Sequence, residues 1–245
     1  MLTVTNLTCG YGEKPIVKNI SFEVPAKKRL CILGPNGCGK TTLLRGIAGL
    51  LPVEGTVRVE GELLSKKSQR QRAQKIALMT QLTPGAFAYT VHETVLLGRY
   101  AHRPDRERDE MIVRESMERT GVWPLRDRLI TELSGGQLQR VFLARTFAQD
   151  PKIILLDEPT NHLDLRCQVE LMEALQLWVT EKDRCAVGVL HDLNLALSFA
   201  DTLLLLQEGK GAFYENTADL DLSLLNTLYG MDVREHMKNT LDRWR

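Results

Sequence analysis

The sequence predicts an α/β fold: a mostly parallel β-sheet packed between helices, an antiparallel β subdomain at the N-terminus and an inserted helical subdomain. Three observations predict it. A glycine-rich loop joins an apolar strand at 30–33 to a helix at 43–50. A strand at 152–157, apolar from Ile153 to Leu156, leads into two carboxylates, Asp157 and Glu158. Between these units, from residue 91 onward, the apolar spacing changes from the period of strands to that of helices.

The N-terminal part is a series of short strands separated by glycine-containing connections. These strands are predicted at 2–7, 20–24, 30–33 and 56–59, and a further strand at 76–80. We expect the N-terminal strands outside the glycine-rich loop to form the antiparallel subdomain.

The glycine-rich loop has the pattern G-x-x-x-x-G-K-[ST]. Its residues are Gly34, Pro35, Asn36, Gly37, Cys38, Gly39, Lys40 and Thr41, followed by Thr42. The glycines let successive N–H groups converge on a phosphate, and the following helix adds its positive end. Lys40 supplies a cation for the outer phosphates and Thr41 a hydroxyl for Mg²⁺. A glycine turn before a helix is the alternative, but the strand and helix on either side favour binding of a nucleoside triphosphate.

The strand at 152–157 ends in Asp157 and is followed by Glu158. An apolar strand of this kind is buried on both faces, so its polar end emerges where the sheet meets a ligand. We expect Asp157 to hold Mg²⁺ through its water shell and Glu158 to polarise the attacking water. The alternative is a surface Asp-Glu pair that closes a strand.

Helices are predicted at 92–99, 108–120 and 138–149, and the last follows Leu133, Ser134, Gly135, Gly136 and Gln137. Ser134 and Gln137 have the spacing of a capping box, which is the structural explanation of this segment. A capping box does not account for the two adjacent glycines. They leave the N–H groups at the helix N-terminus bare, which creates a second anion site. If this site faces outward, it would serve the nucleotide of a neighbouring molecule.

The C-terminal part alternates a helix at 165–178 with strands at 186–190 and 202–207. Alternation of this kind predicts a parallel sheet with the nucleotide at its carboxyl edge. We therefore expect one domain over residues 1–245. Its α/β core comprises 1–84 and 150–245, and its helical insertion comprises 85–149.

Composition narrows the function classes. The 245 residues are 43% hydrophobic and 26% charged, with a net charge of +1, so no basic field indicates a nucleic-acid partner. The five cysteines have no metal-ligand spacing and suggest a reducing cytoplasm. Cys38 precedes a helix, so we expect a lowered pKa and a thiol open to alkylation. No apolar stretch is long enough to span a bilayer, so any membrane crossing belongs to another chain.

The segment 133–137, together with the loop and the Asp-Glu strand, resembles the ATP-binding subunits of ABC transporters, over nearly the whole chain. The resemblance implies a P-loop ATPase that forms a homodimer around two ATP molecules with Mg²⁺. Each ATP is held by the phosphate loop of one copy and the Ser-Gly-Gly turn of the other. Loss of the γ-phosphate then separates the halves and moves whatever is attached to the helical insertion.

The same resemblance assigns roles to four more residues. Tyr11 looks like the aromatic that stacks on adenine, although without the family it reads as a turn tyrosine. Gln81 is similar to the glutamine that senses the γ-phosphate and helps to hold the metal. Asp164 matches the carboxylate of a loop, 161–164, that runs along the dimer seam. His191 resembles the histidine that contacts the γ-phosphate, although a lone histidine after a strand is usually a capped surface residue.

Within the family, segments 88–100 and 191–196 look most like importers of ferric siderophores, haem and cobalamin. Such a subunit lies on the cytoplasmic face of the membrane, contacts a permease near Gln81, and works indirectly with an extracellular or periplasmic binding protein. Molybdate-type oxyanion importers share the pattern. A soluble ABC ATPase, such as a translation factor or a DNA-repair ATPase, is the other alternative, but no second cassette, coiled coil or zinc module is present. Leu138 departs from the family pattern, which usually has a polar residue there.

Overall fold

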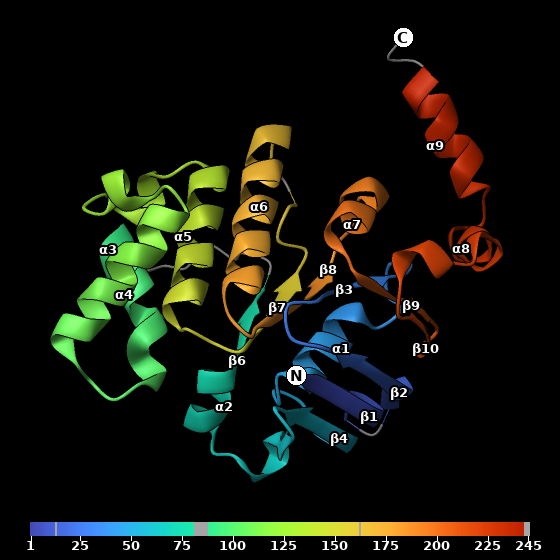
Figure 1. The fold of residues 1–245 in the computed structure, drawn as a ribbon, viewed down its shortest axis with the longest axis horizontal. Helices are drawn as coiled ribbons and strands as arrows, with labels where there is room; N and C mark the ends of the chain where they lie inside the picture. The colour runs from blue at the N-terminus through green and yellow to red at the C-terminus, as the bar shows by residue number, and fades with distance from the viewer. Residues whose placement is uncertain (13, 81–87, 162, 243–245) are drawn as a thin grey trace.

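Two β-sheets form the centre of the structure, a computed structural model that describes residues 1–12, 14–80, 88–161 and 163–242 (Figure 1). One sheet has four strands in the order β2-β1-β4-β5, and the other has six in the order β10-β9-β3-β8-β7-β6. The predicted combination of an antiparallel and a mostly parallel sheet is confirmed.

The larger sheet is parallel except at β10. Its strands are β3 (Arg29–Leu33), β6 (Ile76–Met79), β7 (Ile153–Asp157), β8 (Cys185–Val189), β9 (Thr202–Gln207) and β10 (Lys210–Tyr214). Successive residues of β3 enter two different cores: Leu30 and Ile32 pack in one, Cys31 and Leu33 in the other. Because side chains alternate between the faces and both faces are covered, these strands are apolar throughout.

The smaller sheet is antiparallel at every pairing and lies over α1 (Lys40–Ile47). Its strands are β1 (Leu2–Tyr11), β2 (Lys14–Val24), β4 (Val53–Val59) and β5 (Glu62–Leu63). Gly46 of α1 lies directly on β1, since a Cβ there would stand 2.8 Å from the Cys9 Sγ atom. The strand β1 is longer than predicted and includes Gly10. Glycine allows the close approach to β2 there, since a Cβ at Gly10 would stand 2.1 Å from the Lys14 carbonyl oxygen.

The second core lies between the other face of the parallel sheet and a layer of helices. These helices are α5 (Gly135–Ala148), α6 (Leu165–Glu181), α7 (Leu193–Phe199) and α8 (Leu222–Tyr229). Phe147 of α5 stacks on Trp178 of α6, with ring centroids 5.5 Å apart. Helix α9 (Val233–Leu241) extends away from the body at the C-terminal end (Figure 1).

A block of helices is inserted between β6 and β7, which are neighbouring strands. It contains α3 (Val91–Leu96), α4 (Arg106–Arg119) and α5, and Figure 1 shows it to one side of the sheets. The block has a hydrophobic core of its own, formed by Val91, Val95, Val113, Met117, Val122, Val141, Ala144 and Ala148. Helix α5 also contributes Leu143 and Phe147 to the second core, so this helix ties the block to the rest of the molecule.

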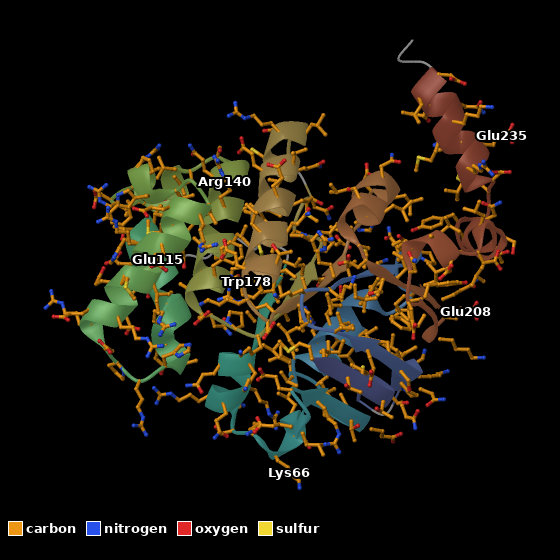
Figure 2. All side chains as sticks on the ribbon, in the orientation of Figure 1. Lys66, Glu115, Arg140, Trp178, Glu208 and Glu235 are labelled. Atoms are coloured by element: carbon orange, nitrogen blue, oxygen red, sulfur yellow. The ribbon has the colours of Figure 1, made fainter. Side chains whose placement is uncertain are left out.

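Polar contacts reinforce the helical block. The buried Arg99 guanidinium forms an ion pair with Asp109 (2.8 Å) and donates to the Ala148 carbonyl oxygen (2.8 Å). Arg140, labelled in Figure 2, extends from α5 to Glu170 of α6, 3.2 Å away. The Gln139 amide donates to the Pro159 carbonyl oxygen (2.6 Å). Helix α5 is therefore held to the α/β core by hydrogen bonds as well as by apolar packing.

Several elements differ from the sequence prediction. The helix predicted at 92–99 is α3 followed by a 3₁₀ segment, Leu97–Ala101. Gly98 packs so tightly on α5 that a Cβ there would stand 2.3 Å from the Arg145 carbonyl oxygen. Helix α2 (Gln69–Lys75), strand β10 and the helices α7 to α9 were not predicted. Among the described residues, no helix combines the length and apolarity needed to cross a membrane.

Candidate functional site

The glycine-rich loop lies between β3 and α1, at the carboxyl edge of the parallel sheet. Gly37 (φ 78°) and Gly39 (φ 111°) have left-handed backbone conformations, which L side chains rarely adopt. Gly34 is required for a different reason: a Cβ there would stand 2.2 Å from the Leu206 carbonyl oxygen. The loop therefore needs its glycines both for its path and for its close approach to β9.

Lys40 is the first residue of α1 and is only 6% exposed. Its ammonium group donates to the carbonyl oxygens of Gly34 (2.7 Å) and Pro35 (2.9 Å) of its own loop. Both acceptors are neutral carbonyl oxygens, so neither of them neutralises the charge of the ammonium group. The loop thus contains a cation ready to exchange carbonyl oxygens for the anionic oxygens of a phosphate.

The next residue, Thr41, contacts the end of β7. Its hydroxyl donates to the Asp157 Oδ1 atom, 2.9 Å away, although the two residues are 116 positions apart. Burial raises the pKa of Asp157, and Glu158 raises it further, while the Thr41 hydrogen bond lowers it. A divalent cation would relieve this cost by neutralising the buried charge.

Thr41 and Asp157 form a donor set that fits Mg²⁺. Mg²⁺ prefers oxygen ligands and usually binds one or two protein groups together with substrate phosphates and waters. Thr41 and Asp157 supply a hydroxyl and a carboxylate in contact with each other, which fits. Within the described ranges no three His, Cys, Asp or Glu side chains cluster as metal ligands.

We predict that Asp157→Asn stabilises the nucleotide-free protein at neutral pH by about 0.5–2 kcal/mol. The native state holds the Asp157 proton more tightly than the unfolded chain does, so ionisation of this carboxyl opposes folding. The free-energy cost of ionising Asp157 in the folded protein grows as pH rises from the pKa of this carboxyl in the unfolded chain through its higher pKa in the native state. The gain in thermal stability should therefore shrink as pH falls toward the ordinary aspartate pKa of 3.8.

Thermal unfolding across this pH range checks the prediction, with Asp127→Asn as the control because the Asp127 side chain is 83% exposed. The same stabilisation in both variants at neutral pH would contradict it. So would a stabilisation by Asp157→Asn that stays constant as pH falls.

Glu158 follows β7 and is held from two sides. One carboxylate oxygen lies 2.5 Å from the His191 Nε2 atom, and the other accepts a hydrogen bond from the Asn161 amide (2.5 Å). Its backbone is left-handed (φ 54°) and its N–H donates to the Val189 carbonyl oxygen. Because β7 and β8 are adjacent parallel strands, the residues that follow them meet at one edge of the sheet.

Ser134 and Gln137 form the predicted capping box at the start of α5. The Ser134 hydroxyl accepts from the Gln137 N–H (3.3 Å), and the Ser134 N–H donates to the Gln137 side chain (3.0 Å). A Cβ at Gly135 would meet no atom within 4 Å, whereas one at Gly136 would stand 2.8 Å from the Cys167 Sγ atom. Gly136 is thus required for packing on α6, and Gly135 leaves the helix end bare.

The remaining predicted residues are distributed around this edge. Tyr11 is 47% exposed at the end of β1, and its hydroxyl accepts from Arg45 of α1 (2.9 Å). Asp164 caps α6 by accepting from the Cys167 N–H (2.8 Å), and this backbone hydrogen bond is the main cause of its lowered pKa. Gln81 lies outside the described residues.

The expectation of a reactive Cys38 is wrong. Cys38 is 7% exposed, and a Cβ at Gly34 would stand 2.8 Å from its Sγ atom. Burial raises the pKa of the Cys38 thiol, and the nearby Lys40 charge does not offset it. The sequence context of a helix N-terminus suggested the opposite shift because burial is not visible in a local pattern.

Besides the contacts of Thr41 with Asp157 and of His191 with Glu158, two more contacts at the site were not predicted. Asn161 was noted only as part of the loop 161–164, and its hydrogen bond to Glu158 follows from a spacing of three residues. Arg45 had no sequence signal, because its partner Tyr11 is 34 positions away and on another element.

Comparison with known proteins agrees with this arrangement. A family model described as "ABC transporter" matches residues 17–161. The achromobactin transport ATP-binding protein CbrD of Dickeya dadantii is 37% identical over 95% of this chain and 89% of its own length. The ferric enterobactin transport ATP-binding protein FepC of Escherichia coli is 42% identical over 83% of this chain and 77% of its own. YvrA of Bacillus subtilis, an uncharacterised ABC transporter ATP-binding protein, is 44% identical over 83% of this chain, which spans 47% of YvrA.

Solved structures share the fold. One, described as a metal-chelate type ABC transporter in an inward-facing conformation, has a TM-score of 0.81 and 30% identity over 94% of this chain and 88% of that one. Another is the dimeric ATP-binding cassette MJ0796 bound to ADP and phosphate, with a TM-score of 0.77 and 28% identity over 88% of this chain and 98% of that one. The chain therefore belongs to the ABC transporter family, as one of its ATP-hydrolysing, ATP-binding subunits.

Proposed function

We propose that this protein is the ATPase subunit of an importer that takes up a metal chelate such as a ferric siderophore, haem or cobalamin. The observation that carries this proposal is the sequence agreement with CbrD and FepC, which are transport proteins for achromobactin and ferric enterobactin and match over most of this chain. The fold similarity to a metal-chelate type transporter supports the same substrate class.

In this proposal the sheet edge is the nucleotide site. The phosphate loop and Lys40 hold the phosphates of ATP, and Thr41 and Asp157 hold Mg²⁺, which would neutralise charge on the phosphates. The Thr41–Asp157 hydrogen bond and the buried charges of Lys40 and Asp157 support these roles. We assign Gln81 to the γ-phosphate and the metal on the family resemblance alone.

Glu158 is proposed to take a proton from the attacking water. His191 contacts one oxygen of its carboxylate and Asn161 contacts the other, so these two residues fix the orientation of the carboxylate toward the water. His191 is exposed enough, at 40% of its side chain, to contact the γ-phosphate as well. Tyr11 would stack on the adenine with its half-exposed ring.

The protein is proposed to work as a homodimer in which Ser134, Gly135, Gly136 and Gln137 bind the ATP of the partner copy, with Asp164 at the seam. The bare N-terminus at Gly135 supports this, as does the position of α5, which Figure 1 shows on the far side of α6 from α1. MJ0796 is dimeric in its solved structure. Asp164 is already engaged as a helix cap, so its role at the seam is structural support for the loop 161–164.

The membrane partner is proposed to be a permease that docks beside the helical block, on the cytoplasmic face of the membrane. A groove of about 720 Å³ lies between α2 and the 3₁₀ segment after α3. It is lined by Arg70, Leu96, Tyr100 and His102, among others, and Tyr100 is 88% exposed. We propose residues 85–149 as the moving subdomain and 1–84 with 150–245 as the core. An extracellular or periplasmic binding protein would deliver the chelate.

Reconstitution with a permease tests the substrate class. The vesicles contain a permease, carry this protein and ATP on the inside, and receive a binding protein on the outside. We predict that they accumulate a labelled ferric siderophore, whereas Lys40→Ala reduces uptake by at least about 100-fold because the phosphates lose their cation. Lys238→Ala, at an exposed lysine on α9, is the matched control. Uptake of molybdate in place of the chelate would contradict the proposed substrate.

A further inference from the structure

The hairpin that carries Tyr11 lies against the phosphate loop. Tyr11 pairs with Lys14 at the end of the β1–β2 ladder. The side chains of Ile16 and Val17, just beyond it, lie 3.1 and 3.0 Å from the position that a Cβ on Gly39 would occupy. The half-exposed Tyr11 ring is therefore at the rim of the anion site, where the base of a bound nucleotide would extend.

Arg45 anchors this ring from the phosphate-binding helix. Its Nη1 atom donates to the Tyr11 hydroxyl, 2.9 Å away, and Arg45 lies on α1, the helix that begins with Lys40 and Thr41. Arg45 therefore connects the aromatic rim to the helix that begins the anion site.

We propose that Arg45 is a positioning residue that holds the Tyr11 ring in the orientation needed to stack on the base of the nucleotide. The inference rests on the proposed role of Tyr11 in binding adenine. Arg45 acts through the Tyr11 hydroxyl, and not by contact with the nucleotide.

The physical effect is preorganisation. An aromatic side chain that is half exposed samples several rotamers, and stacking selects one of them at an entropic cost. A hydrogen bond to the hydroxyl fixes the ring before the nucleotide arrives, so that cost is removed from binding. Stacking uses the face of the base and tolerates different bases, so the effect should be equal for ATP and GTP.

The test is a double-mutant cycle on the full-length protein, with Kd measured by calorimetry for ATP, GTP and inorganic tripolyphosphate, which has no base. Arg45→Met and Tyr11→Phe each remove one end of the hydrogen bond and keep the side-chain volume. We expect each to weaken ATP and GTP binding by about twofold to tenfold, the range that one hydrogen bond allows. The double variant should bind no more weakly than either single variant, and tripolyphosphate affinity should be unchanged.

Two further variants separate the positioning role of Arg45 from the adenine-binding role of Tyr11 on which it rests. Arg58→Met is the control for loss of an exposed arginine, because Arg58 lies on β4 and its guanidinium donates to the Gly61 carbonyl oxygen. It should bind all three ligands like the wild type. Tyr11→Ala removes the ring, and unchanged ATP affinity in that variant would overturn the adenine role of Tyr11 itself.

Other outcomes overturn the role of Arg45 alone. If Arg45→Met weakens ATP binding as strongly in the Tyr11→Phe background as in the wild type, Arg45 contacts the nucleotide directly. If it weakens tripolyphosphate as much as ATP, Arg45 serves the phosphates. If Tyr11→Ala loses ATP affinity while Arg45→Met keeps it, the ring needs no anchor.

Discussion

Replacing Glu158 with glutamine is expected to reduce ATP hydrolysis by about 10²–10⁴-fold, the contribution typical of a positioned general base. Glutamine keeps the shape of the side chain but cannot accept the proton of the attacking water. Its amide group can still meet His191 and Asn161, which now hold the two carboxylate oxygens at 2.5 Å. The local structure should therefore survive, and ATP affinity should stay within about twofold of the wild type, because the P-loop contacts are unchanged.

The same variant should accumulate as an ATP-bound dimer. If two ATP molecules form part of the interface, a copy that binds ATP but cannot hydrolyse it has no route to separation. Single-turnover kinetics measures the loss of rate, and size-exclusion chromatography with and without ATP measures the dimer. Glu115→Gln is the matched control, since Glu115 is an exposed glutamate on α4, away from the sheet edge (Figure 2). A Glu158→Gln protein that remained monomeric with ATP would count against the sandwich.

Mixing two inactive variants is expected to restore activity. Lys40→Ala disables the phosphate loop of its own chain, and Ser134→Arg blocks the helix end that is proposed to face the ATP of the partner. Each homodimer should be inactive, and Ser134→Arg alone should bind ATP almost normally. A mixed dimer, however, contains one pocket with an intact Lys40 from one copy and an intact Ser134 from the other.

Equal mixing makes half of the dimers mixed, each with one working pocket out of two, so we expect up to about a quarter of the wild-type rate. Steady-state ATPase assays across mixing ratios measure it. Lys40→Ala mixed with the Lys40→Ala, Ser134→Arg double variant is the control, because no intact phosphate loop remains. Ser134→Ala reports the loss of the helix cap, which costs about 0.5–2 kcal/mol of stability. Mixtures that stay inactive would place Ser134 in the pocket of its own chain.

Much of the fold could be predicted because its signals are local. The apolar runs of β3 and β7 indicate buried strands, and the glycine pattern between β3 and α1 indicates a phosphate loop. Helix α2 was missed because none of its residues is buried, so it has no apolar period to detect. The predicted helix changes to a 3₁₀ segment at Leu97, and Gly98 in that segment packs on Arg145 of α5, a contact that no local pattern contains.

The chemistry of the site divides in the same way. The sequence by itself was enough to identify the phosphate loop and the carboxylates after β7. The backbone conformation of the loop and the burial of the strand follow from neighbouring residues. Tertiary structure alone decided that Thr41 contacts Asp157, that His191 contacts Glu158 and that Arg45 anchors Tyr11. Each of these pairs joins distant segments, and their contact depends on how the strands and helices pack in the folded chain. Tertiary packing also buried Cys38 and so reversed the direction of its pKa shift, since desolvation depends on surroundings that the chain acquires only when it folds.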